Sequence, residues 1–239
     1  MSSPAPTFGS GPAPLTVALL LADARLPGGG HAHSAGLEPA LQGGMNPALS
    51  RAYLVGRATT VSLVEAGTAV VTSKTLATDP TDHVRLHRVV RAWAARTPAP
   101  AHRDAARLLG RGYLRAAREL WADHPAVEAL VAADTAGRHL PRAVVIGAIA
   151  AASGVSPEDV VRLTVYEDAQ AAASALLRLE PLDPLVPTRW VLDACSAAEP
   201  FVARVAACTQ PEDIPASGAP QTEGWAQTHS LTTQRLFRA

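Results

Sequence analysis

Apolar residues recur along most of the chain at the three- and four-residue spacing of one helix face. Helix-starting residues precede several of these segments: Asn46 and Asp79 each stand before a proline, and Ser156 stands before Pro157 and two acids. No segment shows the alternation typical of a half-buried strand. The pattern predicts an all-α fold. The expected helices cover residues 15–24, 36–42, 46–77, 79–96, 101–122, 140–153, 156–179, 188–197 and 199–208.

The two ends of the chain lack this periodicity. Residues 1–14 are rich in Pro, Ser and Gly, which predicts a flexible N-terminal tail. From Pro211 onward, prolines and glycines predict an irregular C-terminal segment over 211–239. Residues 15–210 between them are expected to form one compact multi-helix domain. The segment 211–239 ends near an apolar pair, Leu236 and Phe237, which needs burial either on its own domain or on a partner.

Composition narrows the classes of function. Hydrophobic residues make up 48% of the chain and aromatics only 4%, so the core must consist mainly of Ala, Leu and Val. Lys+Arg and Asp+Glu both number 21, and this balance argues against a polyanion partner. Cys195 and Cys208 form neither a disulfide framework nor a zinc motif. No apolar stretch reaches the roughly 20 residues that span a bilayer, and no secretory signal is apparent, so we expect a cytoplasmic protein.

The segment 26–38 is the most conspicuous candidate site. Its three consecutive glycines predict a sharp turn, but it lacks the Gly-Lys-Ser/Thr of a phosphate loop and the Gly-x-Ser-x-Gly of a nucleophile elbow. His31 and His33 could offer two imidazoles to a metal ion, which is only half of an ordinary site. The alternative is a structural turn with hydrogen-bonded imidazoles.

A second candidate is a stripe of arginines. Arg103, Arg107, Arg111 and Arg115 are spaced by four residues, which stacks their guanidinium groups on one helix face, with Arg118 close behind. The stripe is either a solvated face or a binding surface. No aromatic residues alternate with these arginines, as they would in many nucleic-acid-binding surfaces. Elsewhere, Glu167-Asp168 and Glu212-Asp213 are neighbours in sequence that point to different sides, so no catalytic pair is predicted.

Four regions together resemble the urease accessory protein F (UreF) family. Leu26-Pro-Gly-Gly-Gly-His-Ala-His-Ser-Ala-Gly-Leu-Glu38 is similar to the family signature Leu-Pro-x-Gly-(Gly/Ser)-aromatic-x-His-Ser-x-Gly-Leu-Glu. The resemblance covers about residues 15–239. The other matching regions are Arg103–Arg118 (a basic middle helix), Leu140–Tyr166 with Arg178-Leu179-x-Pro181-Leu182 after it, and Asp213-Ile214 with His229 and Arg235-Leu236-Phe237. The chain departs from the family pattern at Gly28, His31, Asp183, Pro184 and Ser230.

The resemblance implies a helical, dimeric adaptor without an active site. Family members act with the D-type (also called H) accessory protein and the GTPase accessory protein G on apo-urease, for nickel insertion, and a GTPase-gating role has been proposed. Nickel and GTP then belong to the partner complex, and this chain binds no cofactor tightly. Neither nucleic acid nor membrane is expected as a partner.

The same resemblance indicates which residues meet partners. In the C-terminal segment they are His229, Arg235, Leu236, Phe237 and Arg238, and in the turn they are Gly29, Gly30, His33, Ser34, Gly36 and Glu38. The basic helix with Arg103, Arg107, Arg111 and Arg115 is a further partner-facing candidate. Two alternatives remain at this point: a nickel carrier that uses His31 and His33, and a helical nucleic-acid or regulatory protein that uses the 103–118 face.

Overall fold

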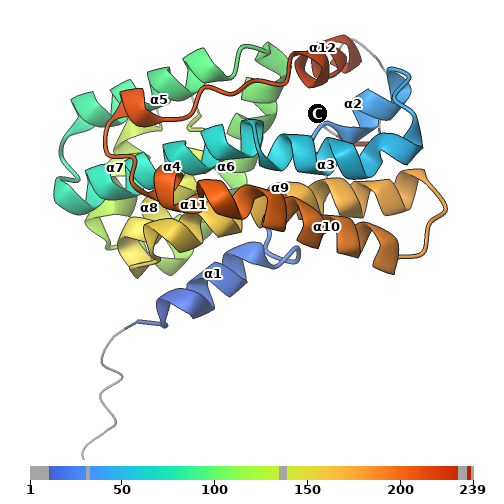
Figure 1. Cartoon of the computed structure of the whole chain (residues 1–239). Coiled ribbons are helices and arrows are strands. Elements are labelled where there is room, and N and C mark those ends of the chain that lie inside the picture. The colour runs from blue at the N-terminus through green and yellow to red at the C-terminus, as the bar shows by residue number, and fades with distance from the viewer. Residues whose placement is uncertain (1–10, 31–32, 135–138, 231–235, 238–239) are drawn as a thin grey trace, which may run out of the picture.

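The described part of the chain consists of helices and their connections (Figure 1). The computed structural model describes residues 11–30, 33–134, 139–230 and 236–237, and within these ranges no β-sheet occurs. The all-α prediction is confirmed. The helices are α1 (Pro14–Ala22), α2 (Leu37–Gln42), α3 (Ser50–Ala58), α4 (Val61–Thr78), α5 (His83–Arg96), α6 (Pro100–Leu120), α7 (Pro125–Ala133), α8 (Arg142–Ser153), α9 (Pro157–Leu179), α10 (Leu185–Ala198), α11 (Val202–Ala206) and α12 (Pro220–His229), with 3-10 turns η2 (Pro47–Leu49), η3 (Glu199–Phe201) and η4 (Pro211–Asp213).

Helices α4 and α8 form the centre of the molecule. The sequence predicts a helix over 140–153 that is apolar almost all round, and α8 is buried at every position from Ala143 to Ala150. Small residues allow a close approach: a Cβ atom on Gly147 would lie only 2.4 Å from the carbonyl oxygen of Ala69 in α4. The core therefore relies on close backbone packing of Ala, Val, Leu and Ile, as the low aromatic content suggests.

The helix expected over 46–77 is not continuous. Asn46 does cap the start of the segment, because its side chain accepts a hydrogen bond from the amide of Ala48 at 2.9 Å. The chain then bends between α3 and α4, where the hydroxyls of Thr59 and Thr60 donate to the carbonyls of Val55 (3.0 Å) and Gly56 (2.6 Å). Threonine side chains thus take up carbonyls at the end of α3, a local effect that apolar periodicity does not reveal.

Length and composition alone would let Pro47–Thr78 cross a membrane, but 61% of its most apolar window is buried inside the protein. The core helix of a globular protein passes the same test, and α4 occupies that central position here (Figure 1).

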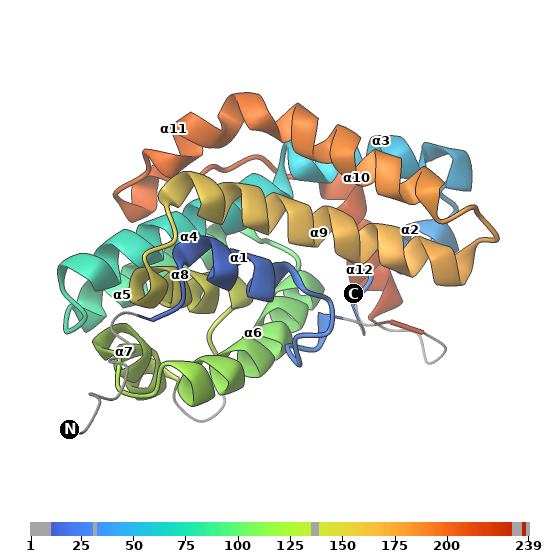
Figure 2. The same cartoon turned by 90° about the horizontal axis from the view of Figure 1, so that it is seen from below.

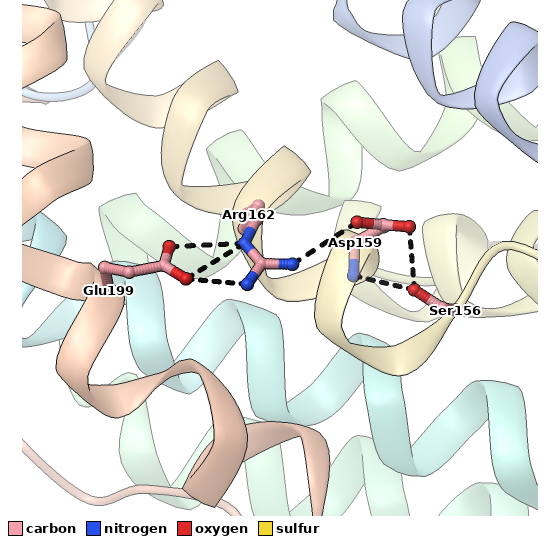
Figure 3. Close-up of polar contacts among 4 residues, drawn as sticks. All are labelled: Ser156, Asp159, Arg162 and Glu199. Atoms are coloured by element: carbon pink, nitrogen blue, oxygen red, sulfur yellow. Dashed lines mark hydrogen bonds and ion pairs between the residues drawn. The ribbon is translucent and has the colours of Figure 1, made fainter.

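Helix α9 begins where the sequence predicts. The Ser156 hydroxyl accepts the amide of Asp159 at 3.1 Å and donates to the carboxylate of the same residue at 2.8 Å. One turn later, Arg162 reaches Glu199 of η3 at 2.6 Å, so the start of α9 is tied to the connection between α10 and α11 (Figure 3). Both side chains of that ion pair are about half exposed, and we expect it to contribute little to stability.

The sequence patterns miss α7 and α12. The prediction of an irregular segment over 211–239 is wrong for Pro220–His229, which forms α12 beside α2 (Figure 1). Trp225 packs on Gly43, where a Cβ atom would lie 2.3 Å from the indole. Ala226 and His229 are buried on the same side of α12. Tertiary packing therefore outweighs the proline and glycine content of this segment.

The N-terminal tail expected over residues 1–14 falls mostly outside the described residues, which begin at 11. Helix α1 starts at Pro14 and lies across α9 (Figure 2).

Candidate functional site

The glycine-rich turn lies directly on α6. A Cβ atom on Gly112 would lie 2.4 Å from the carbonyl oxygen of Gly28, so both positions require glycine for this contact. Gly28 also lies on the ring of Tyr113. Gly29 has a φ of 86°, a left-handed conformation that glycine adopts at little cost. The two candidate regions of the sequence, turn and arginine helix, therefore form one continuous surface.

The second half of the segment 26–38 is buried and leads into α2. Gly36 is buried with a φ of 74°, and a Cβ atom there would lie 2.8 Å from the hydroxyl of Tyr53. That hydroxyl donates to the carbonyl of Ala35 at 2.9 Å. Ser34 is also buried, and its hydroxyl accepts the amide of Glu38 at 3.4 Å. Ser34 and Gly36 thus fix the geometry of the turn.

Glu38 holds the C-terminal segment against the domain. Its side chain is 1% exposed, and its two carboxylate oxygens accept the amides of Leu236 (2.7 Å) and Phe237 (2.8 Å). Gln42, one turn later on α2, donates to the same carboxylate at 3.2 Å. The Nε2 atom of His229 lies 3.4 Å from it. A single buried acid therefore joins α2, α12 and residues 236–237.

Two of the predicted partner-binding residues in this segment face inward. Phe237 is 4% exposed, lines a cavity of about 170 Å³ and lies 5.5 Å below the guanidinium of Arg178. His229 is 3% exposed. Leu236, by contrast, is 73% exposed. The apolar pair thus divides, with Phe237 buried on its own domain and Leu236 in solvent, while Arg235 and Arg238 lie outside the described residues.

The arginine stripe also divides into two halves. Near the start of α6, Arg103 donates to the carbonyls of Thr97 (2.7 Å) and Pro98 (2.6 Å). Arg107 lies over the ring of Trp93 at 5.7 Å. Further along the helix, Arg111, Arg115 and Arg118 are exposed, and no hydrogen bond or ion pair to another described residue engages them. The second half therefore presents guanidinium groups that no described residue engages, whereas those of the first half contact the protein.

A buried ion pair that sequence reasoning missed links α3 to α9. Arg57 donates to both oxygens of Asp168, at 2.6 and 2.9 Å, and Ser62 donates to the same carboxylate at 2.9 Å. Burial alone would raise the pKa of Asp168, but Arg57, with smaller contributions from Arg142 and Ser62, outweighs burial and lowers it. Ser62 donates to the acid directly, without the intervening histidine of a Ser-His-Asp arrangement. The three residues act as a structural tie.

Two further acids lie near this pair. Trp93 donates to Glu65 at 2.6 Å, and Tyr113 donates to Glu167. Burial raises the pKa of both carboxyl groups, against the opposing effect of Arg142. Glu167 and Asp168 thus make different hydrogen bonds, as expected for neighbours in sequence. Arg142 stands at the start of the apolar α8, and a charged residue at such a position is a sequence signal of a buried charge cluster.

His33 lines a partly open pocket of about 70 Å³, together with His102 and the buried charges. Burial, followed by the effect of Arg57, lowers the pKa of His102 to about 3, so this imidazole is neutral at physiological pH. Among the described residues, no three His, Cys, Asp or Glu side chains gather as metal ligands would. His31 lies outside those residues, and the pairing of His31 with His33 on one ion stays a prediction.

Comparison with known proteins identifies the family. The UreF family model matches residues 46–195, well over half of the chain. The chain belongs to the UreF family. "Urease accessory protein UreF" of Mycobacterium sp. (strain JLS) is 38% identical over 228 residues, which cover 93% of this chain and 98% of the relative. The protein of the same name from Mycobacterium tuberculosis (strain ATCC 25618 / H37Rv) is 40% identical over 173 residues, covering 71% of this chain and 75% of the relative.

The matched range of this UreF-family chain runs from η2 into α10 and contains the buried ion pair. Two departures from the family pattern have local structural roles. Asp183 accepts the amide of Leu185 at 2.9 Å, so that α10 begins earlier than the sequence predicts. Ser230 donates to the carbonyl of Gln227 at 2.7 Å and ends α12.

Proposed function

We propose that this chain is an adaptor in urease maturation that acts by binding other proteins. It links the D/H-type accessory protein and the GTPase accessory protein G to apo-urease for nickel insertion, and it gates the GTPase. The observation that carries the proposal is family membership over nearly the full length of a relative named urease accessory protein UreF.

The chemistry of the interior supports a role without catalysis. The polar groups that could serve an enzyme are engaged in packing the core: Asp168 with Arg57, Glu65 with Trp93 and Glu167 with Tyr113. Nickel and GTP are then bound by the partners, and assembly takes place in the cytoplasm. Watching the purified chain turn over a small molecule at an appreciable rate would contradict this part of the proposal.

The C-terminal segment is the proposed contact for the D/H-type protein. Deleting residues 231–239 should abolish co-purification with that protein, because Leu236 is exposed on a segment that Glu38 holds in place. The deletion leaves α12 intact, so helicity measured by circular dichroism should be unchanged. Leu236→Ser should weaken co-purification, whereas Leu120→Ser, at an exposed leucine of α6, should not. Co-purification that survives the deletion would show that the contact lies elsewhere.

We further propose that two copies of the chain associate through α1. Val17 and Leu21 pack this helix on the domain, while Leu15 and Leu19 are 70% and 64% exposed on a helix of mainly apolar residues. Exposed leucines on one such helix favour burial against a second copy.

Leu19→Glu should therefore yield monomers. Light scattering at micromolar concentration should give twice the chain mass for the wild type and for Val84→Glu, a control at an exposed apolar residue of α5. A wild-type chain of single mass would rule out this dimer.

A further inference from the structure

The second half of the arginine stripe carries positive charge that the described part of the chain leaves uncompensated. Arg111, Arg115 and Arg118 are exposed on α6. The nearest acids along the helix do not neutralise them: Asp104 pairs with Arg107 at 3.5 Å, and Glu119 forms no ion pair with Arg115 although it follows one turn later. Like charges four residues apart on a helix destabilise it. A bound anion would remove that repulsion.

These arginines border a groove where the glycine-rich turn meets α6. The groove has a volume of about 490 Å³, and Arg111 and Arg115 line it together with Pro27, Gly29, Leu108 and Leu109. Its apolar lining comes from both elements, since Pro27 belongs to the turn and the leucines to α6. His33 of the same segment also lines the groove, so an imidazole lies in the lining together with the two guanidinium groups. The lining thus combines apolar contact with donors suited to a carboxylate.

We propose that this groove docks an acidic segment of a partner protein, with a carboxylate held between Arg111 and Arg115. Guanidinium groups bind carboxylates through paired, charge-assisted hydrogen bonds, and the leucines offer contact to an apolar neighbour in the same segment. Among the described residues that line the groove there is no Phe, Tyr or Trp, and the chain has zero net charge; both observations favour a protein segment over a nucleic acid. The inference rests on the proposed adaptor function, to which it adds a docking face.

The close contact between Gly28 and Gly112 keeps this groove preformed. Because the turn is fixed on α6 by backbone packing, a partner would meet both walls in place and need not order them. Charge should then govern much of the association, so that binding weakens as salt screens the arginines.

The test uses the full chain and three purified probes: apo-urease, the D/H-type protein and the G-type GTPase of the same organism. Arg111→Gln combined with Arg115→Gln lowers the net charge by two. Arg189→Glu lowers it by the same amount on α10, which lies across the molecule from α6 (Figure 2). We expect the double variant to bind one probe at least about tenfold more weakly, as the loss of charge-assisted hydrogen bonds predicts. Arg189→Glu should bind all three like the wild type.

The outcomes separate the inference from the function on which it rests. If the wild type binds its probes and the double variant binds them equally well at low and physiological salt, the docking face is refuted while the adaptor function stands. Wild-type chain that binds none of the three refutes both. A third outcome concerns a generic DNA duplex at low salt. If the wild type and Arg189→Glu bind the duplex and the double variant does not, while the double variant still binds every protein probe normally, the groove is a nucleic-acid site and the proposal is overturned.

Discussion

Glu38→Gln will release residues 236–237 from the domain. The carboxylate accepts two backbone amides, one on each oxygen, at 2.7 and 2.8 Å. Glutamine keeps the size of the side chain but replaces one acceptor by an NH2 group, which would face an N–H donor. A hydrogen bond to a charged group contributes about 1.5–3 kcal/mol, so amide exchange at Leu236 or Phe237 should accelerate about 10- to 100-fold.

Hydrogen exchange followed by mass spectrometry on the C-terminal peptide measures this effect. Glu119→Gln removes the same charge from the surface of α6 and should leave exchange at residues 236–237 unchanged. Equal protection in the Glu38→Gln variant and the wild type would mean that burial of Phe237, and not Glu38, holds the segment.

Asp168→Ala will cause a large loss of stability. The mutation leaves the Arg57 guanidinium, whose side chain is only 11% exposed, without its partner in the interior. Removing one member of a buried ion pair costs about 3–5 kcal/mol, because the remaining charge stays desolvated. Urea denaturation at neutral pH should show a decrease of that size in the free energy of unfolding.

A second ion pair from α3 supplies the control. Arg51 and Asp193 lie as close, at 2.7 Å, but their side chains are 59% and 32% exposed. Asp193→Ala should therefore cost under about 1 kcal/mol. Similar losses for the two variants would contradict a special role for the buried pair.

The stability difference between wild type and Asp168→Ala should depend on pH. The pKa of Asp168 is lower in the folded state than in the unfolded chain, so its contribution is fully present above about pH 4. As the pH falls through the lower folded-state pKa, the carboxylate becomes protonated and the contribution disappears. The difference between the two proteins should therefore shrink in acid, and a difference that grows there would reverse the assigned direction of the shift.

Local signals explain why so much of the fold could be predicted from sequence. Ser156 marks the start of α9 because its partner, the amide of Asp159, is three residues away. Asn46 likewise caps a local partner, the amide of Ala48 two residues later. The bend at Thr59 and Thr60 was missed although it is local, because hydroxyl bonds to carbonyls leave the apolar pattern intact.

The site depended on contacts that no spacing rule reaches. Arg57 and Asp168 are 111 residues apart in the chain, and Glu38 and Phe237 are 199 apart. The sequence did indicate the glycine-rich turn, the arginines and the C-terminal segment as separate regions. Their relation, with the turn on α6 and Phe237 inside the domain, follows only from tertiary packing.

Helix α6 illustrates how a helix can resist routine engineering. Replacing helical glycines by alanine is a common route to thermostable variants, and Gly56 of α3 has open space around it for such a change. On α6, an added methyl group at Gly110 would lie 2.0 Å from the carbonyl oxygen of Leu140, and one at Gly112 would meet Gly28. Thermostabilising designs and consensus substitutions should therefore leave both glycines unaltered, because the backbone at Leu140 packs against Gly110 and the backbone at Gly28 packs against Gly112.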